Sequence, residues 1–161
     1  IAGQGTTALE MLQQCPKLDF LLVPTGGGGL ISGCSIVTKN ISPHTQVIGI
    51  EPQNLDDAKR SYQTKTHVKT HSGQSIADGL FATTGEINFE IILKYVDGFL
   101  TVTEQNIIEA MKTIWARMKI IVEPSAAVGV AALLEHPYLF KNKNVGIILT
   151  GGNQDLENLP W

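Results

Sequence analysis

Short, wholly apolar runs alternate along this chain with segments in which apolar residues recur at helical spacing. Such runs are typical of strands buried on both faces of a parallel sheet, because a strand with one solvated face would alternate apolar and polar residues. The pattern predicts four strands of this kind, over residues 19–23, 46–50, 99–102 and 144–149.

Helices are predicted between these strands from the 3.6-residue period and from the residues at their ends. In the first helix, Thr6 or Thr7 would supply the N-cap and Pro16 would close the segment; Thr103 with Glu104 would cap a later one. Further helices are expected over residues 30–39, up to residue 62, over 87–96 and over 125–135. The alternation of strand and helix predicts an α/β fold with a doubly wound parallel sheet, whose ligands gather at the carboxyl ends of the strands.

The composition is that of an ordinary globular chain of 161 residues, with 43% hydrophobic and 17% charged residues. A formal net charge of -3 leaves no basic footprint, which argues against nucleic acid as a partner. No apolar run approaches membrane-spanning length and no signal-peptide pattern opens the chain, so we expect no membrane partner. Cys15 and Cys34 lack metal-ligand spacing and suit a reducing, cytoplasmic compartment.

Four consecutive glycines, residues 26–29, follow the first predicted strand after Pro24 and Thr25. Glycine has no Cβ, so successive backbone N–H groups can converge on one point in conformations that other residues reach only with strain. A helix beginning at Leu30 would add unpaired N–H groups and the positive end of its dipole. This arrangement predicts an anion site, usually for phosphate. A flexible linker is the alternative, but linkers are usually Ser-rich and lack apolar flanks.

Two nucleotide-binding motifs match this segment poorly. Gly28 and Gly33 have the spacing of a P-loop, but Cys34 stands where that motif needs a lysine to neutralise phosphate charge. A dinucleotide motif would find a ribose ligand in Glu51, yet no choice of first glycine puts a glycine at the last position of the motif. A non-catalytic domain that binds phosphate or a nucleotide stays open as the alternative to an enzyme.

Five short motifs follow one another along the chain: Gly3-Gln4-Gly5-Thr6, Pro24-Thr25-Gly26-Gly27-Gly28-Gly29-Leu30, Ala77-Asp78-Gly79, Glu123-Pro124-Ser125-Ala126 and Thr150-Gly151-Gly152-Asn153. Together they resemble successive blocks of the fold-type II pyridoxal-phosphate enzymes, and in order and spacing the serine racemase and serine/threonine dehydratase group. The resemblance covers essentially the whole chain, and five ordered motifs are far more specific than any single one.

The resemblance implies roles for these motifs. The backbone N–H groups of five residues would hold the phosphate of pyridoxal phosphate: Gly26, Gly27, Gly28, Gly29 and Leu30. Thr150 would place its hydroxyl at the pyridine nitrogen, although a plain turn hydroxyl is the alternative. A neutral hydroxyl does not enforce protonation of that nitrogen, which suits proton removal at Cα and loss of a β-hydroxyl better than transamination. Asp78 and Glu123 would lie near the cofactor or simply cap the helices that follow them.

The resemblance extends to a metal site. Glu51, the carbonyl of Leu55 and Asp57 resemble the divalent-cation site of serine racemases and would supply hard oxygen ligands for Mg²⁺ or Ca²⁺. The alternative is a solvated acidic helix cap, which needs no ion. His67 and His71 lie four residues apart, but the run from 63 to 74 has no apolar helical face, so we expect an exposed connection and no zinc pair.

Three residues resemble the positions that bind ATP between the subunits of animal-type serine racemases: Arg117, Lys119 and Asn153. The resemblance therefore implies ATP as an effector and a homodimer as the full-length assembly. Positive groups near a helix end are also ordinary in the absence of any ligand.

No lysine of this chain stands in the N-terminal block from which the family takes its Schiff-base lysine, and the small domain with its catalytic serine is absent too. Since the chain also begins at Ile1, we expect residues 1–161 to be a single partial domain, the C-terminal half of the large cofactor-binding domain, inactive alone. At full length we expect a cytoplasmic enzyme that racemises serine, dehydrates serine or threonine to a 2-oxo acid and ammonia, or both. Hydroxyaspartate stays an open substrate variant.

Overall fold

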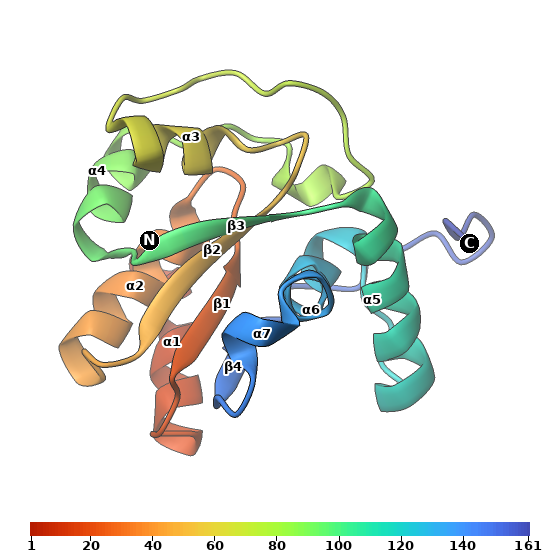
Figure 1. Ribbon diagram of the computed structural model, residues 1–161, viewed down its shortest axis with the longest axis horizontal. Coiled ribbons are helices and arrows are strands. Elements are labelled where there is room, and N and C mark those ends of the chain that lie inside the picture. The colour runs from red at the N-terminus through yellow and green to blue at the C-terminus, as the bar shows by residue number, and fades with distance from the viewer.

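A computed structural model describes residues 1–161, and at its centre lies a four-stranded parallel sheet (Figure 1). The strands are β1 (Phe20–Pro24), β2 (Gln46–Pro52), β3 (Gly98–Val102) and β4 (Val145–Ile147), in the spatial order β3-β2-β1-β4. Leu22 of the inner strand β1 lies opposite Ile48 of β2 and Ile147 of β4. The predicted α/β class and the parallel sheet are confirmed.

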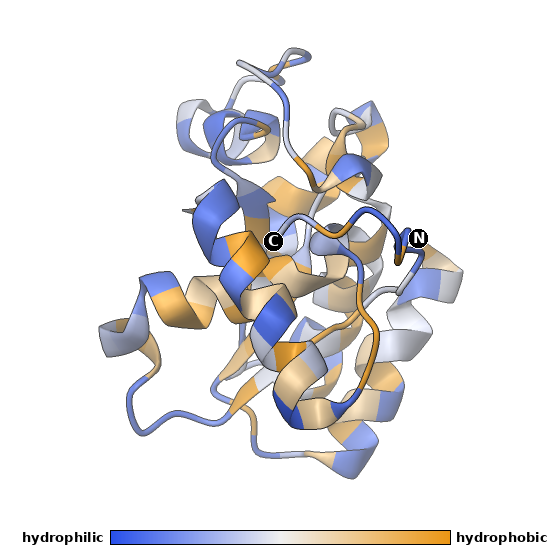
Figure 2. Ribbon diagram, turned by 90° about the vertical axis from the view of Figure 1, so that its right-hand side faces the viewer, coloured by the Kyte–Doolittle hydropathy of each residue, from blue (hydrophilic) through white to orange (hydrophobic).

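Helices cover both faces of the sheet, and each carries hydrophobic and hydrophilic residues, as Figure 2 shows. They are α1 (Ala2–Gln14), α2 (Gly29–Ile41), α3 (Asp57–Thr64), α4 (Glu86–Tyr95), α5 (Glu104–Met118), α6 (Pro124–Glu135) and the short α7 (Pro137–Phe140), with a 3-10 turn at Asp78–Leu80. None of these helices combines the length and the apolar character that a membrane-spanning helix needs.

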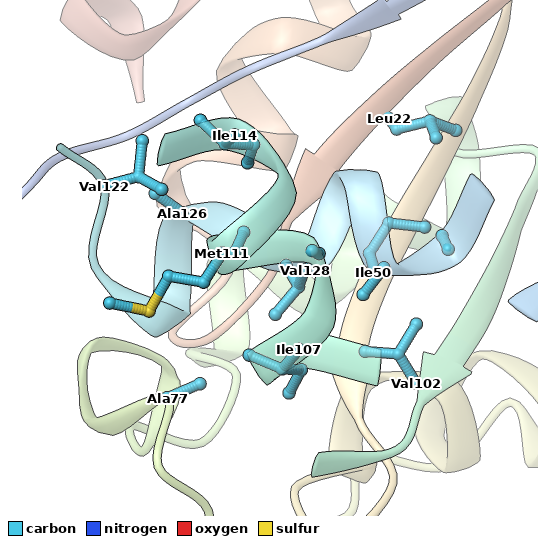
Figure 3. Close-up of a cluster of buried hydrophobic side chains, with 14 of the residues drawn as sticks. Leu22, Ile50, Ala77, Val102, Ile107, Met111, Ile114, Val122, Ala126 and Val128 are labelled. Atoms are coloured by element: carbon cyan, nitrogen blue, oxygen red, sulfur yellow. The ribbon is translucent and has the colours of Figure 1, made fainter. Parts of the chain in front are cut away.

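Two hydrophobic clusters fill the space between the sheet and the helices. On one face, α5 and α6 pack against the sheet around Leu22 and Ile50, with Met111 and Ile114 projecting from α5 (Figure 3). On the other face, residues of α1, α2 and α4 surround Leu21 and other strand residues. Neighbouring residues of a strand point to opposite faces, so β1 contributes to both clusters.

The first helix begins earlier than the sequence indicates. Ile1 occupies the N-cap position, so neither Thr6 nor Thr7 caps α1, and the hydroxyl of Thr6 donates back to the carbonyl of Gly3 at 2.7 Å. Gly5 is buried where α1 crosses α2, and a Cβ built on it would lie 3.1 Å from the carbonyl oxygen of Gly33. Close helix packing therefore outweighs the low helix propensity of glycine here.

Two other segments differ from expectation. Pro137 does end α6, but it also starts α7, because proline is well tolerated in a first helical turn. Most of the long connection after α3, at the top of Figure 1, is exposed as predicted, but His67 and His71 are half-buried, which the sequence does not indicate. There His67 stacks on Phe89 with ring centroids 5.0 Å apart, and His71 contacts Phe81 at 4.8 Å.

Candidate functional site

A pocket of about 270 Å³ lies at the carboxyl ends of β1 and β4. It brings together the glycine run, Thr150 before the second pair of glycines (Gly151 and Gly152) and the start of α6, which are far apart in the sequence. Its lining residues are Pro24, Gly26, Gly27, Gly28, Gly29, Leu30, Gly79, Leu80, Glu123, Ser125 and Thr150. All six residues predicted to bind the cofactor therefore line one pocket, in the position where doubly wound sheets bind their ligands.

The glycine run forms the turn from β1 into α2. Gly28 is the N-cap of α2 and adopts the left-handed conformation, with φ 85° and ψ 0°. A Cβ built on Gly26 would lie 2.9 Å from the Cα of Leu80, whereas one built on Gly29 would meet nothing within 4 Å. Glycine is thus required for conformation at Gly28 and for space at Gly26, and the first turn of α2 leaves unpaired N–H groups beside the pocket.

Glu123 also lines this pocket. Its Oε2 accepts a hydrogen bond from the N–H of Asn153 at 3.1 Å, and its own N–H donates to the carbonyl of Gly151 at the same distance. The side chain makes no cap bond to α6. The sequence leaves open whether Asp78 and Glu123 lie near the cofactor or only cap helices. Glu123 lines the pocket, whereas Asp78 does not.

Ser125 and Gly79 complete the wall, although the sequence does not identify them as site residues. The buried hydroxyl oxygen of Ser125 accepts a hydrogen bond from the N–H of Gly79 at 3.0 Å. A Cβ built on Gly79 would lie 2.9 Å from that oxygen, so glycine is needed for the close approach. The only signal in the sequence is that both residues lie within motifs of the resemblance.

Glu51 lies within β2 and is completely buried. Its Oε1 accepts a hydrogen bond from the N–H of Ala58 at 3.0 Å, and its Oε2 accepts one from the N–H of Lys59 at 2.8 Å, so the carboxylate caps α3. Burial raises the pKa of Glu51 to about 8; the two N–H bonds oppose this shift, and the charges of Asp57 and Asp56 add to it.

Asp57 is buried at the start of α3. Its Oδ2 accepts a hydrogen bond from the N–H of Thr84 at 2.9 Å, and its Oδ1 lies 3.5 Å from Nδ1 of His71. The structure contains no group of three or more His, Cys, Asp or Glu side chains that could hold a metal ion. The predicted set has only two such side chains and a carbonyl; two buried carboxylates fit a hard divalent cation by their donor chemistry, since each oxygen keeps a lone pair beyond its N–H bond.

The residues predicted to bind ATP do not share one pocket. Asn153 lines a second, polar cavity beside the first, together with Asp78, Pro124 and Asp155. Lys119 is the left-handed C-cap of α5, with φ 61°, and neither it nor the exposed Arg117 lines that cavity.

Sheet and pocket together define an α/β protein with a glycine-lined pocket at the carboxyl end of a parallel sheet. The chain belongs to the family of pyridoxal-phosphate dependent enzymes, whose family model matches residues 1–151. The predicted resemblance is confirmed.

Within this family the chain is similar to several curated proteins. The chain is 40% identical over 161 residues to a beta-hydroxyaspartate dehydratase of Paracoccus denitrificans, covering 100% of this chain and 51% of the relative. It is 45% identical over 163 residues to a serine racemase of Dictyostelium discoideum, covering 99% and 50%. The chain thus spans about half the length of the curated relatives it matches.

Solved structures agree with this assignment. The crystal structure of serine racemase from Dictyostelium discoideum superposes with a TM-score of 0.88 at 45% identity, over 96% of this chain and 50% of that one. The crystal structure of a T.th. threonine deaminase gives a TM-score of 0.91 at 39% identity, over 95% of this chain and 58% of that one. The architecture is therefore that of fold-type II enzymes of this group.

Proposed function

We propose that residues 1–161 form the C-terminal half of the large domain of a pyridoxal-phosphate dependent enzyme. At full length this enzyme racemises serine, eliminates ammonia from serine or threonine, or does both. The observation that carries the proposal is the single pocket in which the glycine run, Glu123 and Thr150 meet. Relatives named serine racemase, threonine deaminase and beta-hydroxyaspartate dehydratase support the substrate class, with hydroxyaspartate as a variant within it.

The glycine run binds the cofactor through its phosphate. Unpaired N–H groups of the loop and of the first turn of α2 would donate hydrogen bonds to the phosphate oxygens, and the positive end of the α2 dipole would favour the negative charge. The open space at Gly29 leaves room for an anion, because no side chain occupies it.

Thr150 acts at the other end of the pocket. When bound, pyridoxal phosphate supplies a conjugated ring that withdraws electrons from the substrate Cα. The hydroxyl of Thr150 would hold the ring nitrogen without fixing a proton on it, since a hydroxyl is neutral. This moderates the electron withdrawal and favours proton exchange at Cα and loss of a β-hydroxyl over transamination.

A divalent cation, Mg²⁺ or Ca²⁺, is part of the proposal, held by Glu51, Asp57 and the carbonyl of Leu55. Burial of both side chains supports it, because burial raises the pKa of Glu51 to about 8 and a bound cation would favour the charged form of Glu51. Its role is structural, at the start of α3. ATP as an effector at Lys119 and Asn153, a homodimer and a cytoplasmic location complete the proposal.

The test uses the full-length protein that contains this chain, purified without added cofactor. We expect an absorbance band at the edge of the visible range that borohydride removes. We also expect D-serine, or ammonia with a 2-oxo acid, to form from L-serine, L-threonine or hydroxyaspartate. A colourless protein that binds a nucleotide and leaves all three amino acids unchanged would overturn the proposal in favour of a non-catalytic nucleotide-binding domain.

A further inference from the structure

The glycine run is held from behind by α4. The carbonyl oxygen of Gly27 accepts two hydrogen bonds, one from the side-chain amide of Asn88 at 2.6 Å and one from the N–H of Gly85 at 3.1 Å. Gly85 is the N-cap of α4 and Asn88 lies in its first turn. The contact between Gly27 and Asn88 spans 61 residues of sequence, so it fixes the loop to a distant element.

These two bonds determine the orientation of one peptide group. A trans peptide is planar, and its C=O and N–H groups point in opposite directions. Because the oxygen of Gly27 faces α4, the N–H of Gly28 points away from α4, and both glycines line the pocket. If this peptide were free to rotate, an electron-rich oxygen could replace a donor at the place where the phosphate binds.

Packing supports the same orientation. A Cβ built on Gly28 would lie 2.9 Å from the Cβ of Asn88 and 3.3 Å from Cγ2 of Thr84. The side chain of Asn88 is half-buried there, and its amide donates to the carbonyl of Gly27. Asn88 therefore constrains two neighbouring glycines, Gly27 by a hydrogen bond and Gly28 by close packing.

The segment that carries Asn88 is itself anchored. Thr84 is buried, and its N–H donates to Oδ2 of Asp57 at 2.9 Å. The carbonyl oxygen of Thr84 lies 2.6 Å from Nε2 of His67, whose ring stacks on Phe89. A support fixed at both ends of its first turn can hold the loop in one shape.

We propose that Asn88 is a positioning residue for the phosphate cradle, because its side-chain amide holds the carbonyl of Gly27 and so directs the N–H of Gly28 at the cofactor phosphate. The proposal rests on the proposed function, since it needs a phosphate in this pocket. Asn88 acts only through the loop and does not contact the reacting atoms.

The test measures pyridoxal-phosphate binding by the full-length apoenzyme. Replacing Asn88 by alanine removes the donor, and the isosteric Asn88→Asp replaces it with a negative charge that faces the oxygen of Gly27. We expect the dissociation constant for the cofactor to rise about 3- to 10-fold for Asn88→Ala, and at least about tenfold for Asn88→Asp. The ³¹P chemical shift of the bound phosphate should move in both variants. Glu86→Gln is the matched control, because Glu86 lies in the same helical turn but is exposed and pairs with Lys69.

The outcomes separate this proposal from the proposed function. If the wild-type protein binds no pyridoxal phosphate, both are overturned. If it binds the cofactor and both Asn88 variants keep its affinity and ³¹P shift, only the positioning role is overturned. Equal weakening by Glu86→Gln would also overturn it, because the loss would then belong to α4 as a whole. Since Asn88→Asp preserves shape, it gives a result even if the alanine variant does not fold.

Discussion

The hydroxyl oxygen of Ser125 accepts a hydrogen bond from the N–H of Gly79 at 3.0 Å and joins the start of α6 to the 3-10 turn in the wall of the pocket. Oδ1 of Asp78 also accepts a hydrogen bond from this N–H, at 2.8 Å.

We therefore expect Ser125→Ala to lower the free energy of unfolding by about 1 kcal/mol, which is less than the cost of leaving a buried N–H without any acceptor. Urea denaturation of the full-length protein measures this. The exposed Ser72→Ala is the control, expected within about 0.5 kcal/mol of wild type.

Replacement by alanine should change the free energy of unfolding in opposite directions at Gly28 and at Gly3. At Gly28, φ is +85° and a Cβ would lie 2.9 Å from the Cβ of Asn88, so Gly28→Ala should destabilise by about 1 to 3 kcal/mol. Gly3 lies in α1 with nothing within 4 Å of a built Cβ, so Gly3→Ala should stabilise by about 0.5 to 1 kcal/mol. Thermal unfolding of the two variants checks both signs, and equal shifts would contradict the left-handed conformation at Gly28.

The lowered pKa of Glu135 predicts part of the loss of protein stability at acidic pH. Burial raises its pKa, but hydrogen bonds from Thr103 and Asn106 to Oε2 outweigh burial and hold the pKa below its ordinary value of 4.5. A depressed folded-state pKa stabilises the protein above pH 4.5, and this stabilisation is lost as the pH falls through the folded-state pKa.

The acid sensitivity of Glu135 is tested by urea unfolding between about pH 6 and pH 3. Wild type should lose more stability than Glu135→Gln, which cannot titrate at this position. The exposed Glu109→Gln should keep the wild-type loss. Parallel curves for wild type and Glu135→Gln would show that the hydrogen bonds to Glu135 do not persist in solution.

Divalent cations should stabilise the protein through Glu51. If Mg²⁺ or Ca²⁺ binds only the folded state, a concentration one hundred times its dissociation constant adds about 2.7 kcal/mol of stability. Chelation should remove this gain, and Glu51→Gln should abolish it. Thermal unfolding with and without Mg²⁺ measures the effect, with the exposed Glu86→Gln as control. An equal Mg²⁺ response in both variants would place the cation elsewhere.

How much the sequence predicts depends on the range of the interaction. The glycine run is identifiable because its chemistry is local, a turn without Cβ atoms, and Thr150 is identifiable because its motif resembles a block of the family. Asn88 and Ser125 are not, because their partners Gly27 and Gly79 lie 61 and 46 residues away. Only the folded chain brings these groups together.

The differences at the chain's beginning and around Glu51 have the same cause. Thr6 has the side chain of an N-cap, but the close crossing of α1 and α2 at Gly5 extends the helix to Ala2. As a plain helix cap Glu51 would be solvated, yet it is buried and bonds to the first turn of α3. Local propensity cannot show which distant backbone groups will need a partner.

The position of β1 has a consequence for measurement. Leu21 and Leu22 belong to different hydrophobic clusters, so this one strand is an indispensable wall of both helical layers. The glycine run begins after a single intervening residue, Thr25. Weaker packing in either helical layer would displace the loop that binds the phosphate. The absorbance of the bound cofactor would therefore report whether both hydrophobic clusters are intact.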